Sequence, residues 1–158
     1  MTRTFLIKRD IISTKTVRAV CGSGLPPLTG LAPELFAGAD HICLVSDRAC
    51  LKLFRKKFEK MLGRRMAGTD IFVLPAGNRA KAFSSLEKLL SFLLKRGFSR
   101  SSVLVAAGGG SVTDLAGLAA ALYMRGIKWI SVPTTLLGQI DAEEVGARPG
   151  ARIEWGDS

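Results

Sequence analysis

The chain has 158 residues with a formal net charge of +10, and 47% of its residues are hydrophobic. This length favours a single domain with a substantial core, and the hydrophobic content argues against a disordered chain. No apolar run approaches the ~20 uncharged residues that span a bilayer, and the apolar stretch near the start is too short for a secretory signal, so a cytoplasmic location is expected.

The predicted elements begin with two β-like stretches, Thr4 to Lys8 and Val17 to Cys21, which could pair as a short hairpin. From residue 41 onward, apolar strands alternate with helices. The predicted strands are 41–46, 70–74, 103–107 and 129–133, and the predicted helices are 48–62, 83–96 and 111–124. Strands without polar alternation, separated by helices, are typical of a parallel sheet that helices cover on both faces. The sequence therefore predicts an α/β, Rossmann-like domain preceded by a β-hairpin.

The helix predicted over 83–96 carries leucines at helical spacing, opens with Ser84 and Ser85, and ends at Gly97. We expect these leucines to form one buried stripe, and they are Leu86, Leu89, Leu90, Leu93 and Leu94.

Much of the positive charge lies between residues 55 and 65, where basic residues alternate with Phe58, Met61 and Leu62. The apolar residues recur at helical spacing, which favours a solvated helix face over a surface that binds nucleic acid. No nucleic-acid or membrane partner is therefore expected.

The chain has three cysteines, Cys21, Cys43 and Cys50, and a single histidine, His41. Neither residue type falls in a pattern typical of disulfides or metal ligands, so we expect buried free thiols. A metal site built from this chain alone would lack ligands.

Polar or glycine-rich residues follow each predicted strand of the parallel sheet, where ligands bind in such folds. They are Asp47, the segment 76–81, the segment 108–114, and Thr134 with Thr135. Three glycines in a row at 108–110 let the backbone approach a phosphate, and the helix behind them offers unpaired N–H groups.

Each of the other signals has two interpretations. Asp114 could hold a ligand hydroxyl or favour the first turn of its own helix. Thr134 and Thr135 could donate to phosphate or ribose oxygens or cap a turn, and Lys81 could contact a phosphate or be an ordinary surface lysine. Because all of these residues follow strand ends, together they predict a nucleotide site.

Three segments resemble a known family, and they are 74–81 (LPAGNRAK), 108–127 (GGGSVTDLAGLAAALYMRGI) and 132–141 (VPTTLLGQID). Their order and spacing resemble the amino-terminal, NAD-binding half of 3-dehydroquinate synthase, one of the sugar-phosphate cyclases. Iron-dependent alcohol and glycerol dehydrogenases share the fold and a similar glycine turn, but the segment 132–141 favours the cyclases.

The resemblance implies a set of NAD contacts, with Asp114 and Asp141 where nicotinamide and substrate meet and Asp141 as the catalytic residue. The implied cofactor-binding residues are Asp47, Ala76, Gly77, Asn78, Lys81, Gly109, Gly110, Ser111, Val112, Thr113, Asp114, Thr134 and Thr135. It also implies the family's reaction, in which a seven-carbon keto sugar phosphate is cyclised to 3-dehydroquinate in the shikimate pathway. There NAD transiently oxidises a ring hydroxyl so that phosphate can be eliminated, and a divalent metal, zinc or cobalt, polarises the oxygen of the oxidised carbon.

The chain departs from the family after Asp141, where the expected Gly-Lys-Thr and Gly-Lys-Asn motifs are missing. Ala147-Arg148-Pro149 and Ala151-Arg152-Ile153 are what codons for those motifs encode one base out of frame. We therefore expect an NAD-binding domain over 1–142 and a divergent, frameshifted tail over 143–158. The family's helical carboxyl-terminal domain, which carries a Glu and two His metal ligands, is expected to be absent.

Asn78 also stands where the family has an acidic residue, and its amide offers one acceptor oxygen instead of two. The resemblance thus predicts a truncated NAD-binding half, inactive by itself, with a homodimer or a complementing carboxyl-terminal fragment as partner. Two alternatives remain, which are a stand-alone nucleotide-binding module that pairs with a separate metal domain and a cyclase for another sugar phosphate.

Overall fold

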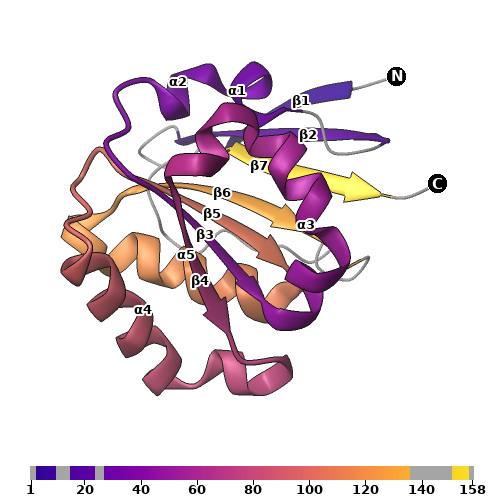
Figure 1. The fold of residues 1–158 in the computed structure, drawn as a ribbon. Helices are drawn as coiled ribbons and strands as arrows, with labels where there is room; N and C mark the ends of the chain where they lie inside the picture. Colours follow the sequence, from indigo (N-terminus) through magenta and orange to yellow (C-terminus); the bar gives the residue numbers. More distant parts are fainter. Residues whose placement is uncertain (1–2, 10–14, 24–26, 136–150, 157–158) are drawn as a thin grey trace.

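The computed structural model describes residues 3–9, 15–23, 27–135 and 151–156. Within these residues, seven strands form one sheet in the order β1-β2-β7-β6-β5-β3-β4 (Figure 1). The strands are β1 (Arg3–Arg9), β2 (Lys15–Ser23), β3 (Ile42–Asp47), β4 (Thr69–Leu74), β5 (Val103–Gly108), β6 (Lys128–Pro133) and β7 (Ala151–Gly156). β1 and β2 are antiparallel, and all other neighbours are parallel.

The path of the chain changes direction at β3. From β3 it runs outward to β4, then returns past β3 to β5 and continues to β6. Because parallel crossovers are right-handed, this reversal places the connecting helices on opposite faces. Accordingly α3 (Arg48–Leu62) covers one face, and α4 (Phe83–Lys95) and α5 (Gly110–Leu122) cover the other (Figure 1).

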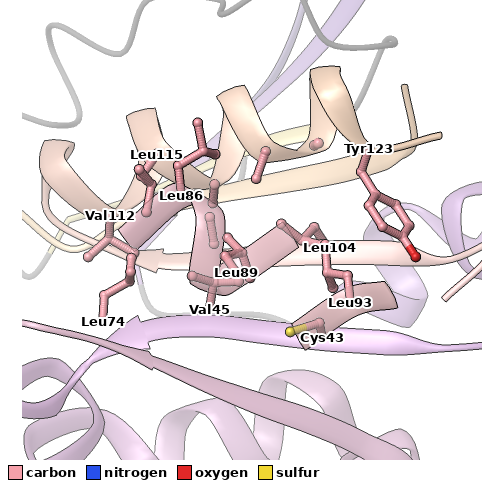
Figure 2. Packing of buried hydrophobic residues seen from close by; sticks show 14 of the residues in the cluster. Cys43, Val45, Leu74, Leu86, Leu89, Leu93, Leu104, Val112, Leu115 and Tyr123 are labelled. Carbon is pink, nitrogen blue, oxygen red and sulfur yellow. The ribbon is translucent and has the colours of Figure 1, made fainter. Parts of the chain in front are cut away.

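Two apolar clusters fill the two faces of the sheet. In β5, Leu104 and Ala106 belong to the cluster beneath α4 and α5, which Figure 2 shows from close by. The alternate residues Val103, Val105 and Ala107 belong to the cluster beneath α3. Successive residues of a strand point to opposite faces, so a strand buried on both sides is apolar throughout.

Close contact between α5 and the sheet depends on small residues in the helix. A Cβ at Gly117 would lie 3.1 Å from the Trp129 ring of β6, and Ala116, Ala119 and Ala120 are fully buried. Larger side chains on this face would push the helix away from the sheet.

The predicted fold class is confirmed. The helix 48–62 has the predicted bounds, the other predicted elements of the parallel sheet differ by at most two residues at an end, and the β-hairpin is present. Short elements were missed, and they are α1 (Leu28–Leu31), α2 (Pro33–Phe36), η1 (Gly63–Gly68), η2 (Gly77–Lys81), η3 (Tyr123–Arg125) and β7. β7 lies within the predicted tail and joins the hairpin to the rest of the sheet.

Two expectations for α4 were wrong. Leu94 is 65% exposed, because it follows the buried Leu93 by 100° around the helix and so leaves the apolar stripe. The helix begins after Ala82 without a side-chain cap, and the Ser85 hydroxyl instead donates to the Arg79 carbonyl at 3.1 Å. In the described part of the chain, no helix has the length and apolar character that a membrane crossing needs.

Candidate functional site

The carboxyl ends of the central parallel strands meet at one edge of the sheet. Gly108 at the end of β5 lies opposite Pro133 at the end of β6, and Asp47 at the end of β3 lies opposite Leu74 of β4. The Thr134 N–H donates to the Gly108 carbonyl at 2.9 Å, which ties the two turns together. The edge includes the position between β3 and β5 where the strand order reverses, the position at which such sheets bind ligands.

The glycine turn has little room for side chains on its inner side. A Cβ at Gly108 would lie 2.7 Å from both Cβ and Cγ2 of Val112, and one at Gly109 would lie 3.3 Å from Cγ2 of Thr135. At Gly110 a Cβ would have nothing within 4 Å. The turn therefore packs tightly against the protein at its first two glycines and is open at the third.

Gly109 is the N-cap of α5, and its carbonyl accepts the Val112 and Thr113 N–H groups at 2.9 and 3.2 Å. The N–H groups of Gly110 and Ser111 come first in the helix and have no intrahelical acceptor. Together with the positive end of the helix dipole, they give this turn the electrostatics of an anion site. The side chains of Val112 and Thr113 are buried.

The segment η2 lies beside the start of α5. Lys81 Nζ is 3.0 Å from Asp114 Oδ2, with 54% and 46% of the two side chains exposed. A pair this open to solvent adds little to stability, but it shows that η2 lies next to the first turns of α5. Gly77 opens η2 with φ of 66°, a conformation that favours glycine.

Asp47 has a structural role that the sequence interpretation missed. Its carboxylate accepts the Cys50 N–H at 2.8 Å and so caps α3. The signal was available, because an aspartate directly before a predicted helix is a common N-cap.

Two substitutions of Asp47 separate its capping role from the cofactor contact that the resemblance implies. We expect Asp47→Ala to lower the free energy of unfolding by about 1 kcal/mol through the lost cap, and Asp47→Asn to leave it nearly unchanged because an amide oxygen also caps. If the carboxylate also contacts a ribose, Asp47→Asn should weaken NAD binding several-fold at unchanged stability. Urea unfolding and calorimetric NAD titration measure the two effects, and equal losses of stability for both variants would contradict the capping role.

Two further side chains beneath the edge, Ser46 and Cys50, were missed as parts of the site. The buried Ser46 hydroxyl donates to the Ala107 carbonyl at 2.6 Å, and Cys50 Sγ lies 3.7 Å from Thr134 Oγ1. Burial is the main cause that raises the pKa of the Cys50 thiol, so it stays neutral at pH 7. A serine that interrupts an apolar strand was the available signal for Ser46.

The free, buried thiols expected for Cys43 and Cys50 are confirmed, and burial raises the pKa of Cys43 to about 12. The His41 ring packs against the Phe98 ring at an interplanar angle of 33°, with ring centroids 5.0 Å apart. Across residues 3–9, 15–23, 27–135 and 151–156, no group of three or more His, Cys, Asp or Glu residues is arranged to hold a metal ion.

The structure thus brings most of the implied cofactor-binding positions to one edge. Asp47, Ala76, the turn at 109–114 and Thr134 all lie at carboxyl strand ends or in the elements that follow them. The Asn78 backbone belongs to η2, while its side chain, and Asp141 altogether, lie outside the described residues.

An open, largely parallel sheet with helices on both faces and a glycine-led helix at its reversal point defines a Rossmann-like α/β fold. The family model described as "3-dehydroquinate synthase N-terminal" matches residues 71–156, more than half of the chain. The chain belongs to the 3-dehydroquinate synthase family.

Individual relatives agree with this assignment. The 3-dehydroquinate synthase of Blochmanniella floridana is 33% identical over 153 residues, 96% of this chain and 42% of the relative. That of Rhodospirillum rubrum is 40% identical over 134 residues, 83% of this chain and 34% of the relative. The chain therefore spans less than half the length of these curated relatives.

Solved structures share the fold at lower identity. A 2-deoxy-scyllo-inosose synthase complexed with carbaglucose-6-phosphate, NAD+ and Co2+ gives a TM-score of 0.73 at 22% identity, covering 98% of this chain and 46% of that one. The 2-epi-5-epi-valiolone synthase of Streptomyces hygroscopicus, with NAD+ and Zn2+ bound, gives 0.67 at 20% identity, covering 94% and 45%. An iron-containing alcohol dehydrogenase gives 0.65 at 16% identity, covering 86% and 45%.

Proposed function

We propose that the residues at this edge of the sheet form the NAD-binding part of an enzyme that cyclises a keto sugar phosphate to 3-dehydroquinate. The observation that carries the proposal is the convergence of three segments at the reversal point of the sheet. The glycine turn is joined to the end of β6 through Thr134 and to η2 through the Lys81–Asp114 pair.

The glycine turn fits a pyrophosphate. The space around Gly110 leaves its backbone open to a ligand, and the first N–H groups of α5 are donors for phosphate oxygens. Lys81 stands beside this turn with half of its side chain exposed, and its ammonium group is paired there with the Asp114 carboxylate. The Thr134 hydroxyl, next to Cys50 Sγ, is a further donor at the same edge.

In this assignment the cofactor supplies reversible hydride acceptance, and the chain's own residues bind and orient it. The described residues do not fit a divalent metal, because they contain no cluster of ligand side chains. With one histidine in 158 residues, the family's Glu and two His ligands cannot be assembled from this sequence. We therefore propose that the chain binds NAD but does not complete the reaction by itself.

Isothermal titration with NAD tests this proposal, together with an assay for phosphate release from the seven-carbon sugar phosphate in the presence of zinc. We expect saturable binding of one NAD per chain and no phosphate release. Absence of NAD binding would refute the cofactor assignment. Turnover by the isolated chain would refute the proposal that it does not complete the reaction by itself.

Two glycines provide a matched pair of variants. A methyl group added at Gly110 or at Gly68 would have no atom within 4 Å, and neither residue has a positive φ, so alanine fits at both. Gly68 lies at the amino end of β4, on the opposite edge of the sheet. We expect Gly110→Ala to raise the Kd for NAD by about tenfold, roughly 1.4 kcal/mol, and Gly68→Ala to leave it unchanged. Equal effects would argue against phosphate binding at this turn.

A further inference from the structure

Beneath the candidate cofactor edge, a set of polar contacts joins the start of α3 to the residue that follows β6. The Asp47 carboxylate accepts the Cys50 N–H at 2.8 Å, which fixes Cys50 in the first turn of α3. From there Cys50 Sγ lies 3.7 Å from Thr134 Oγ1, and only 5% of Cys50 is exposed. Since β5 lies between β3 and β6 in the sheet, this contact reaches across the point where the strand order reverses.

Thr134 is held at two points. Its N–H donates to the Gly108 carbonyl at 2.9 Å, which ties its backbone to the glycine turn. Its hydroxyl oxygen accepts a hydrogen bond from the Cys50 thiol. A hydroxyl has one proton and two acceptor lone pairs, so a hydroxyl that accepts from the thiol keeps its own proton to donate elsewhere. Among the residues that the structure describes, no acceptor takes that proton.

The surroundings of the sulfur make the thiol the donor in this contact. Burial is the main cause that raises the pKa of Cys50, and it outweighs the hydrogen bonds with Ser46 and Thr134, so the sulfur keeps its proton at pH 7. The Ser46 hydroxyl donates to the Ala107 carbonyl at 2.6 Å, so its proton is already used. A neutral thiol sulfur is only a weak acceptor. The favoured arrangement is therefore an S–H group that donates to the Thr134 oxygen.

We infer that Cys50 is a positioning residue for the cofactor, because its S–H group turns the Thr134 hydroxyl so that the hydroxyl proton faces an oxygen of the bound dinucleotide. The inference rests on the proposed function and adds to that site a residue that does not itself touch the ligand. In Cys50→Ala a methyl group replaces the donor. The Thr134 hydroxyl is then free to rotate, and part of the energy of its bond to the cofactor is lost in fixing its orientation.

A double-mutant cycle with Cys50→Ala and Thr134→Val tests the inference, with the Kd for NAD measured by titration calorimetry at pH 7. We expect Thr134→Val to raise the Kd about fivefold, as for the loss of one typical hydrogen bond, and Cys50→Ala to raise it about threefold. In the Thr134→Val background, Cys50→Ala should change the Kd by less than about 1.5-fold, because no hydroxyl remains to be oriented. Additive effects of the two substitutions would overturn the inference.

Cys43→Ala is the matched control. Cys43 is a second buried thiol, and it belongs to the apolar cluster beneath α4 and α5, whereas Cys50 belongs to the cluster beneath α3. Both substitutions remove a sulfur atom from a packed site, so both should lower the free energy of unfolding in urea. Only Cys50→Ala should raise the Kd. A similar rise in Cys43→Ala would mean that general destabilisation weakens binding, and Cys50 would then have no positioning role.

The S–H stretching band in the infrared spectrum gives a second readout, on the unsubstituted chain, which does not depend on whether Cys50→Ala folds. When Thr134 donates to the bound cofactor, its oxygen becomes a stronger acceptor, because hydrogen bonds in a chain polarise one another. We therefore expect saturation with NAD to lower the frequency of the Cys50 band and to leave the Cys43 band in place. The chain has three cysteines, so the bands lost in Cys21→Ala and in Cys43→Ala leave the third to Cys50.

Failure of the inference and failure of the proposed function give different results. If NAD binds but the Cys50 band does not move, or if Cys50→Ala binds NAD as tightly as the unsubstituted chain, the inference is overturned and the proposed function stands. If NAD does not bind to the folded chain, the proposed function is overturned together with the inference. Circular dichroism of each variant establishes that the chain is folded in every titration.

Discussion

Replacing Gly108 with alanine should lower the free energy of unfolding by about 1–3 kcal/mol, because the added methyl group has no space. It would lie 2.7 Å from Cβ and Cγ2 of Val112 and 3.1 Å from Cγ1. Cβ of Val112 is fixed to the backbone of α5, and a β-branched side chain has few alternative rotamers in a helix. The strain can be relieved only by moving the start of α5 or the end of β5.

That movement would also affect the candidate site, since Val112 lies in the first turn of α5. We expect Gly108→Ala to weaken NAD binding in addition to its effect on stability. Gly110→Ala is the matched comparison, because alanine there meets no neighbour and should change stability by less than about 0.5 kcal/mol. Urea unfolding of both variants gives the stability difference. Equal stability of the two variants would mean that the turn is not packed as described.

The parallel part of the fold could be predicted because β3 and β5 are buried on both faces, and α3 and α4 each have an apolar stripe. Both patterns are local in the sequence, and the predicted bounds of β3, β5 and α3 were accordingly close. The four-residue helices α1 and α2 are too short to show a periodicity. β7 mixes charged and apolar residues, and it is a strand by its parallel pairing with the distant β2, which no local pattern reveals.

The candidate site could be predicted at the level of segments but not of contacts. Parallel topology alone brings the residues after β3, β5 and β6 to one edge. The pairing of Lys81 with Asp114 and the contact between Cys50 and Thr134 depend on how η2 and α3 dock, which is set by tertiary packing. A hollow of about 550 Å³ beside the carboxyl end of β4 is lined by residues of β4, α3, α4 and the segment after β4, so no single stretch of sequence indicates it. The role of Asp141 and the domain division at residue 142 stay predictions.

Two adjacent leucines of α4 should respond very differently to truncation. Leu93 is fully buried in the cluster beneath α4 and α5, where Figure 2 shows it near Cys43 and Leu104, while Leu94 is 65% exposed. We expect Leu93→Ala to lower the free energy of unfolding by about 2–5 kcal/mol, from lost apolar burial and the cavity left behind. Leu94→Ala should cost less than about 0.5 kcal/mol, because leucine and alanine have similar helix propensities and little burial is lost.

Thermal unfolding followed by circular dichroism measures this difference. For a chain of this length each kcal/mol corresponds to roughly 2–4 °C in Tm, so the two variants should differ by about 4–20 °C. Because both substitutions remove the same atoms from neighbouring positions of one helix, effects on the unfolded chain largely cancel in the comparison. A larger loss for Leu94→Ala would mean that α4 packs on the sheet by another face. Ser85 and Lys88 would then no longer line the hollow beside β4, so this pair of variants also tests how that hollow is formed.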